Sequence, residues 1–271
     1  MFCDKIGWKV SIFKQYGNGG IIIGDKDNDK VRKHVFCAIS GLKVFAEELM
    51  DAGIDSIAKA DKLSYWIELW TMYLRGESEF NSRKLRRYKR GEVIKVNLGF
   101  NVGSEEGGLH YAVVIDTDNK LSDPTIRIVP LTSVKPEKDI DNLPTGNVYL
   151  RNEIYANLSE KISIEKRNIL QKIEDIKQQS YGKISDCIEI ETKNKLEKEM
   201  QLISRMTNEI NKMKEGSVAL VNQITTISKM RIYDPKTNYD ILSNIKISDE
   251  SLDLIDESII KMYTKADKNS N

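Results

Sequence analysis

The sequence is poor in the residues that form disulfides and metal sites. Its 271 residues include 3 cysteines and 2 histidines. Cys3, Cys37 and Cys187 lie far apart and are odd in number, so they predict neither a disulfide framework nor a zinc site. This cysteine usage fits a reducing cytoplasm. Because no cluster of histidine, aspartate and glutamate has ligand spacing, we expect neither a metal ion nor another cofactor.

Long apolar runs and a dominant charge are also missing. No apolar stretch reaches the roughly 18 residues of a membrane span, and Met1 to Lys14 lacks the apolar region of a signal peptide. The net charge is +1, so a nucleic-acid site would have to be a local basic patch. The sequence contains no Gly-x-Ser-x-Gly elbow, Walker pattern or dinucleotide fingerprint, which argues against the corresponding enzyme classes.

Helical periodicity marks two parts of the chain. In residues 29–75 apolar residues recur at helical spacing, with a helix end at Gly53, and we expect their face to be buried. The residues of the first helix on that face are Val31, Val35, Ala38, Ile39, Leu42, Phe45, Ala46 and Leu49. Residues 157–214 carry two further stripes separated by a break at Tyr181-Gly182. These stripes predict an antiparallel helical hairpin.

Strand signals lie between these helical parts, in the stretch from residue 89 to residue 133. Three short apolar or alternating runs, 92–98, 111–115 and 125–131, are bounded by glycine, asparagine, aspartate and proline, as strands are. Between the first two runs, Gly99 to Gly108 contains four glycines in ten residues. Such a loop can bring its backbone N–H groups close to a ligand.

A basic run leads into the first predicted strand. Six of the eight residues from Arg83 to Arg90 are lysine or arginine. The run is explained equally well by a solvated linker and by contacts with nucleic-acid phosphates, because basic residues neutralise the phosphate backbone. The sequence leaves both interpretations open.

Several motifs occur in the order that a known family has them. They are Arg90-Gly91-Glu92, the loop Gly103 to Gly108, the strand end Pro130-Leu131-Thr132-Ser133, the late block Gly216 to Ile232, and a closing helix from Ile247 to Ile260. Together they resemble the MazF/PemK family of toxin ribonucleases from bacterial type II toxin–antitoxin systems. The resemblance covers about residues 89–140 and 215–263.

The resemblance implies an α+β fold. Its centre would be a small antiparallel SH3-like β-barrel of the PemK/CcdB type, formed by residues 89–264. We expect an N-terminal mostly helical region at 1–88, the helical hairpin 157–214 as an insertion into the barrel, and a disordered tail at 265–271.

The resemblance also implies a function. Members of the family are toxins that cleave single-stranded RNA without a metal ion, by attack of the 2′-OH on the adjacent phosphorus. Such a reaction needs a base, an acid and a donor for the phosphorane, and it leaves a 2′,3′-cyclic phosphate and a 5′-OH. We therefore expect a cytoplasmic endoribonuclease that forms a homodimer and binds an antitoxin protein.

The site residues follow from the same resemblance. The family has an arginine just after the Gly-Gly pair, where this chain has His110, and a threonine or serine at the position of Thr132 and Ser133. We predict these three residues to be catalytic, although His110 could also be a structural hydrogen-bonding residue and Thr132 an ordinary strand residue. The predicted RNA-binding residues are Arg90, Ser104, Glu105, Gly107, Gly108, Lys229 and Arg231.

The replacement of arginine by His110 leaves a second function open. Histidine can give or take a proton near neutral pH, whereas arginine supplies a permanent charge and a fork for phosphate. The alternative is therefore a catalytically lost module that binds RNA or protein. A further possibility is that the N-terminal helical region acts in cis as a built-in antitoxin.

Overall fold

The computed structural model describes residues 25–134, 140, 142–179, 186–213 and 216–265. Two compact units divide the chain, residues 1–61 and residues 62–271. The helices are α1 (Asp25–Asp51), α2 (Ile54–Gly76), α3 (Glu153–Gln179), α4 (Asp186–Lys212) and α5 (Asp249–Tyr263). The break between α1 and α2 falls at Gly53, as predicted, where the backbone φ is 106°. Within the described ranges, no helix is both long and apolar enough to span a membrane.

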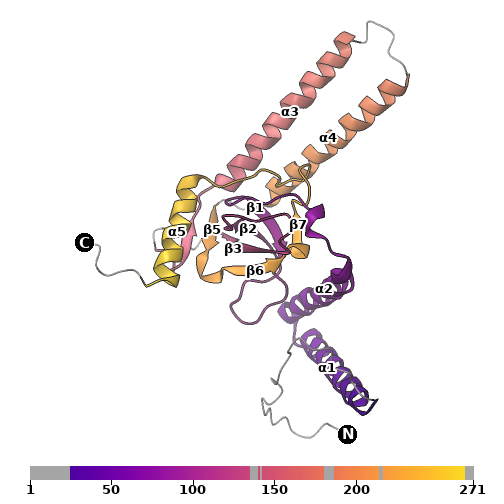
Figure 1. Ribbon diagram of the computed structural model, residues 1–271, viewed down its shortest axis with the longest axis vertical. Coiled ribbons are helices and arrows are strands. Elements are labelled where there is room, and N and C mark those ends of the chain that lie inside the picture. The colour runs from indigo at the N-terminus through magenta and orange to yellow at the C-terminus, as the bar shows by residue number, and fades with distance from the viewer. Residues whose placement is uncertain (1–24, 135–139, 141, 180–185, 214–215, 266–271) are drawn as a thin grey trace, which may run out of the picture. The chain divides into compact units, whose positions relative to one another are not determined.

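The second unit is organised around one antiparallel sheet (Figure 1). Its strands are β1 (Val93–Asn97), β2 (Leu109–Val114), β3 (Thr125–Ser133), β4 (Asn147–Tyr149), β5 (Ser217–Leu220), β6 (Thr225–Ser228) and β7 (Ile232–Asp234). The order is β4-β5-β3-β2-β1-β7, and β6 also pairs with β3. The late part of the sequence therefore completes the sheet that the earlier strands begin.

The predicted barrel is not formed. The two ends of the sheet, β4 and β7, are 3 residues long each, and in the described chain they pair with β5 and β1 but not with each other. A closed barrel would require β4 to pair with β7. Helix α5 instead packs against β4. Closure depends on pairing between distant segments, which the local patterns that predict strands do not contain. The observed fold is α+β with an open antiparallel sheet.

Both faces of the sheet are buried, and the alternation of β1 agrees with the prediction. Ile94, Val96 and Leu98 belong to one apolar cluster, together with Ile227 of β6. Val93 belongs to a second cluster on the opposite face, which also contains residues of α3, α4 and α5. Because successive side chains of a strand point to opposite faces, a single strand contributes to both cores.

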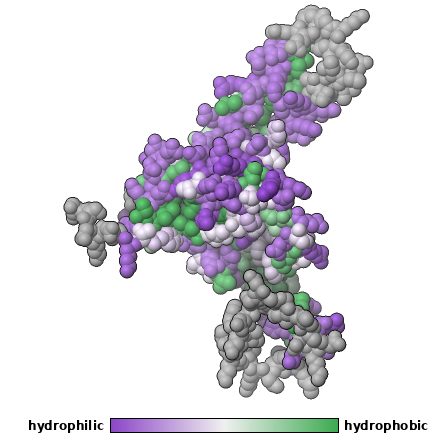
Figure 2. All heavy atoms as spheres, viewed as in Figure 1, coloured by the Kyte–Doolittle hydropathy of each residue, from purple (hydrophilic) through white to green (hydrophobic). Residues whose placement is uncertain are grey.

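The predicted helical hairpin is present as α3 and α4, each 27 residues long, which corresponds to about 40 Å. Only its base enters the core of the sheet, through buried residues such as Leu158 and Met206, each 0% exposed. Farther out the helices pack on each other, and Lys172 pairs with Glu199 at 2.6 Å. Figure 2 shows that the surface of the described arms is largely hydrophilic. The predicted break at residues 181–182 lies outside the described residues.

Helix α5 begins where the closing helix was predicted. Ser248 caps it, since its side chain accepts a hydrogen bond from the backbone N–H of Ser251. Ile255 is 0% exposed and packs in the same core as the base of the hairpin. The Tyr263 hydroxyl donates to the carbonyl of Val221 at 2.9 Å. The predicted disordered tail lies almost wholly outside the described residues.

The expected burial of the α1 face is wrong. The helix forms, but Val35, Ile39 and Phe45 on that face are 49%, 63% and 40% exposed. Leu49 is the member of this face that is classed as buried, at 9% exposed. Amphipathic spacing predicts a helix and the face that is suited to packing, but it does not supply the surface that covers this face.

Candidate active site

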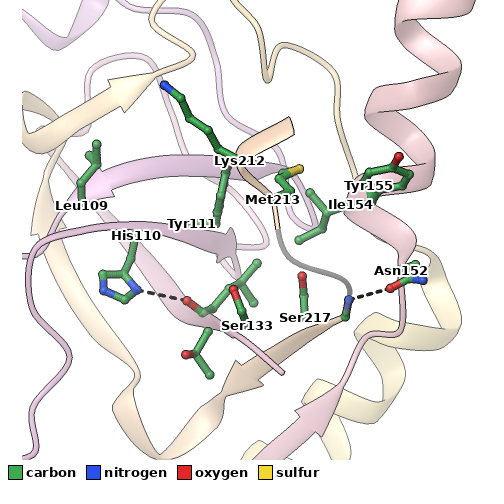
Figure 3. Close-up of a pocket in the computed structure, with 13 residues that line it drawn as sticks. Leu109, His110, Tyr111, Ser133, Asn152, Ile154, Tyr155, Lys212, Met213 and Ser217 are labelled. Atoms are coloured by element: carbon green, nitrogen blue, oxygen red, sulfur yellow. Dashed lines mark hydrogen bonds between the residues drawn. The ribbon is translucent and has the colours of Figure 1, made fainter. Parts of the chain in front are cut away.

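Strands β2 and β3 bring the three predicted catalytic residues together. Ala112 pairs with Pro130 in the antiparallel register, and continuation of this register places His110 opposite Thr132. His110, Thr132 and Ser133 all line one cavity of about 300 Å³. Figure 3 shows His110 and Ser133 in this cavity. The pairing of β2 with β3 therefore brings a histidine close to two hydroxyl residues that lie more than twenty residues after it in the sequence.

The imidazole of His110 is held at Nδ1 and has a carboxylate near Nε2. Its Nδ1 lies 3.2 Å from the carbonyl oxygen of Leu131. A carbonyl oxygen can only accept, so Nδ1 carries the hydrogen, and in the neutral ring the lone pair lies on Nε2. The Nε2 atom is 3.6 Å from a carboxylate oxygen of Glu106, so an ion pair forms when the ring is protonated. This arrangement suits His110 to take up a proton through Nε2.

Three of the predicted RNA-binding residues line a second cavity, of about 640 Å³. These are Ser104, Glu105 and Arg231. Glu106 also lines this second cavity, while its carboxylate faces His110 of the first. Glu106 therefore links a residue of the first cavity to the lining of the second, and the sequence analysis did not select it.

Arg231 provides a positive charge in the second cavity. Its Nε donates to the carbonyl of Asn97 at 2.8 Å, and its guanidinium lies 5.5 Å from the ring centre of Trp66. Burial lowers the pKa of Arg231, and the nearby Tyr73 counteracts this effect. An arginine nevertheless keeps its charge at neutral pH, so this side chain can attract a phosphate.

Gln223 holds the glycine-rich loop in place. Its side-chain Nε2 donates to the carbonyl of Ser104 at 3.1 Å, and its Oε1 accepts from the N–H of Glu106 at 3.3 Å. Gln223 follows β5, so the late block of the chain fixes a loop that lies more than a hundred residues earlier. The resemblance of the late block, Gly216 to Ile232, to the family was a signal that could have identified Gln223.

The glycines of the loop build its shape. A Cβ atom on Gly107 would lie 2.8 Å from the carbonyl oxygen of Gly99. The N–H of Gly108 already donates to that same oxygen, at 2.6 Å, and its φ is 85°. The N–H of Gly108 is therefore used within the loop. The RNA-binding role of Gly107 and Gly108 stays a prediction.

Two other predicted RNA-binding residues lie away from both cavities. Arg90 donates to the carbonyl of Ile115 and to the carboxylate of Asp256 in α5. Lys229 is 2% exposed, its Nζ donates to the carbonyl of Lys120 at 2.8 Å, and burial lowers its pKa. These contacts hold loops and α5 against the sheet, so neither residue is assigned to RNA.

The basic run before β1 is tied to carboxylates in a similar way. Arg86 pairs with Glu92 at 2.8 Å, and Arg87 pairs with Asp118 at 3.1 Å. Together with the Arg90–Asp256 pair, these contacts favour the interpretation of the run as a structural linker. Phosphate contact by the same arginines would require that these pairs break.

A half-buried cluster joins the hairpin to the strands beside His110. Glu209 of α4 accepts hydrogen bonds from Lys95 of β1 and from the hydroxyl of Tyr111 of β2. Burial raises the pKa of Tyr111, and the hydrogen bond to Glu209 raises it further. Burial alone would raise the pKa of Glu209, but the bonds from Lys95 and Tyr111 lower it below 4.5.

The cluster predicts a dependence of stability on pH. Because the pKa of Glu209 is lowered in the folded chain, its ionised form stabilises the fold above pH 4.5, and this contribution is lost as the pH falls further. We expect the difference in unfolding free energy between the native protein and Glu209→Gln to shrink on acidification below pH 4.5. Urea denaturation across this range measures it. Glu199→Gln, in the more exposed pair with Lys172, is the control, and an equal pH response of both variants would contradict the assignment.

The described residues contain no group of three or more histidine, cysteine, aspartate or glutamate side chains arranged to hold a metal ion. The groups that surround the cavities are instead an imidazole, hydroxyls, carboxylates, amides and a guanidinium. These are the groups of general acid–base chemistry and of anion binding.

The fold and the cavities define an α+β protein with a histidine–hydroxyl site at the edge of a glycine-rich loop. Residues 89–192 match the family described as PemK-like, MazF-like toxin of type II toxin–antitoxin system. The resemblance predicted from the sequence is thereby confirmed, with the same first residue. The match extends into the hairpin and leaves out the late block, although that block completes the sheet. Toxins of this family are generally endoribonucleases. No curated protein matches the chain.

Proposed function

We propose that this chain is the toxin of a type II toxin–antitoxin system and cleaves single-stranded RNA without a metal ion. The observation that carries the proposal is the placement of His110 beside Thr132 in one cavity, with Nδ1 on a backbone carbonyl and Nε2 beside Glu106. An imidazole that is fixed in this way can accept a proton from the substrate. Nδ1 carries the hydrogen, so Nε2 has the free lone pair that accepts it.

In the proposed reaction, Nε2 of His110 takes the proton of a ribose 2′-OH. The 2′-oxygen forms a bond to the adjacent phosphorus, and the bond from phosphorus to the 5′-oxygen breaks. The 5′-oxygen leaves with a proton from solvent, so the products are a 2′,3′-cyclic phosphate and a 5′-OH. The hydroxyls of Thr132 and Ser133 donate to the phosphorane oxygens, as a preformed oxyanion site does.

The substrate would continue into the second cavity, where Arg231, Ser104 and Glu105 are RNA-binding residues. This path is supported by Glu106, which lines the second cavity and has its carboxylate 3.6 Å from Nε2 of His110 in the first. The charge of Arg231 takes over part of the role that the family's arginine has, since His110 carries no permanent charge.

The family relationship supports the remaining proposals. An antitoxin protein would inhibit the chain by covering the RNA groove, two copies would form a homodimer, and both would act in the cytoplasm. Residues 89–264 would form one functional domain related to the SH3-like barrel, with 157–214 inserted into it and 1–88 as a separate helical region. The N-terminal region could also act in cis as an antitoxin. If it does, deletion of this region should increase toxicity.

The test is cleavage of a long single-stranded RNA in EDTA by the purified chain, with chemical analysis of the fragment ends. Discrete cuts that end in cyclic phosphate are the expected result. Uncut RNA at high protein concentration, with antitoxin excluded, would contradict the ribonuclease. This result would favour the alternative, a module that has lost catalysis and binds RNA or protein. The specific argument for this alternative is the replacement of the family's arginine by His110.

A further inference from the structure

The hairpin supplies one wall of the cavity that contains His110. Ile154 and Tyr155 at the start of α3, and Lys212 and Met213 at the end of α4, line this cavity together with the β2 and β3 residues. Figure 3 shows Ile154 and Tyr155 on the α3 side, with Ser133 and His110 on the strand side. The base of the α3–α4 hairpin is therefore part of the candidate site.

This wall is fixed to the sheet. Ile154 is 2% exposed and packs in the same core as the β3 residue Leu131. The carboxylate of Glu209 joins α4 to Lys95 and Tyr111, the neighbour of His110. A pocket wall that is held in this way keeps its position relative to the reacting groups, so it can bind without first being ordered.

The outer part of the wall has the chemistry that single-stranded RNA requires. Tyr155 is 43% exposed at the cavity, and Lys212 is also exposed. An accessible aromatic ring can stack on a nucleobase without sequence restriction, and a lysine can contact the phosphate backbone. The cavity volume of about 300 Å³ is at the lower end of small-ligand sites, which suits a single nucleotide.

We propose that the base of the hairpin is a nucleotide subsite, in which Tyr155 stacks on the base next to the scissile phosphate and Lys212 contacts the backbone. The proposal rests on the ribonuclease function, because it places that nucleotide beside the proposed reacting groups. It gives the base of the α3–α4 hairpin a role in substrate binding.

The experiment measures the dissociation constant for a single-stranded oligonucleotide with 2′-O-methyl riboses, which lacks the attacking hydroxyl and stays uncut. We expect Tyr155→Ala to weaken binding by about tenfold, the lower part of the range for a stacked base. Tyr155→Phe retains the ring and should stay within about twofold. Tyr239→Ala, at a residue that is 82% exposed and lines neither cavity, is the matched control and should also bind normally.

The contribution of Lys212 is measured by the salt dependence of binding. Loss of one phosphate contact lowers the slope of log K against log salt concentration by about 0.7 for a single strand. Lys212→Ala should show this smaller slope, and Lys212→Arg should retain the native one. An unchanged slope in Lys212→Ala would remove Lys212 from the subsite.

The outcomes separate the subsite from the ribonuclease. Equal affinities of Tyr155→Ala and Tyr239→Ala would overturn the subsite, whether or not ordinary RNA is cut. Weaker binding by Tyr155→Ala alone supports the subsite, and it would remain as an RNA-binding site even if the native protein failed to cut ordinary RNA. Absence of binding by the native protein would overturn the subsite directly.

Discussion

Replacement of His110 by alanine should slow RNA cleavage by about 10²–10⁴-fold, the usual contribution of a general acid–base group. The reason is that Nε2 is the nitrogen with a free lone pair beside the cavity, since Nδ1 is bonded to the Leu131 carbonyl. The rate should be measured in EDTA at saturating RNA, so that the effect on kcat is separated from RNA binding. Added imidazole should restore part of the rate to His110→Gly.

The chain contains a control for this variant. Its other histidine, His34, is exposed on α1 in the first unit, and His34→Ala should cleave at the native rate. Equal rates for His110→Ala and the native protein would keep the ribonuclease but remove His110 from the proton chemistry. The hydroxyl of Thr132 and the charge of Arg231 would then be the groups to test next.

A large loss of stability is expected when Arg86 is replaced by alanine. The side chains of Arg86 and Glu92 are 6% and 5% exposed, and they pair at 2.8 Å. Removal of one partner from a buried ion pair leaves an uncompensated charge, which costs about 3–5 kcal/mol. Glu92 also accepts from the N–H of Lys89 at 3.0 Å, so the lower end of this range is expected. Urea denaturation measures the difference in unfolding free energy.

The adjacent residue provides the matched control. Arg87 pairs with Asp118, but these side chains are 60% and 58% exposed. Exposed pairs contribute at most about 1 kcal/mol, so Arg87→Ala should change the stability little. Similar losses for the two arginines would show that burial of the Arg86 pair does not determine its contribution.

Features that depend on residues close in sequence could be predicted, and features that depend on contacts between distant segments could not. The alternation of Ile94 and Val96 with Val93 could be predicted, because a strand places successive side chains on opposite faces regardless of its partners. The hairpin could be predicted for a similar reason, from apolar stripes within each helix. Closure of the sheet into a barrel could not be predicted, because it depends on whether the distant strands β4 and β7 pair with each other.

The same distinction applies to the candidate site. His110 and Thr132 were identified from motifs, and the pairing of β2 with β3 brings them together. Arg90 and Lys229 were predicted to bind RNA, but the sequence did not indicate their intramolecular partners, Asp256 and the carbonyl of Lys120, which are distant in sequence. No sequence pattern indicated that Tyr155 lines the same cavity, since this depends on where the first turn of α3 lies after β4.

The close approach of Gly107 to Gly99 has a genetic consequence. A Cβ on Gly107 would meet the Gly99 carbonyl at 2.8 Å, and a Cβ on Gly99 would meet the ring of Trp66 at 2.8 Å. Any base change at the first two positions of a glycine codon replaces the glycine. If the chain is toxic as proposed, cells that are selected to survive its expression should acquire escape mutations at these two codons as well as at the codon for His110. The positions of these mutations would identify the residues that support the loop as well as the residues that react.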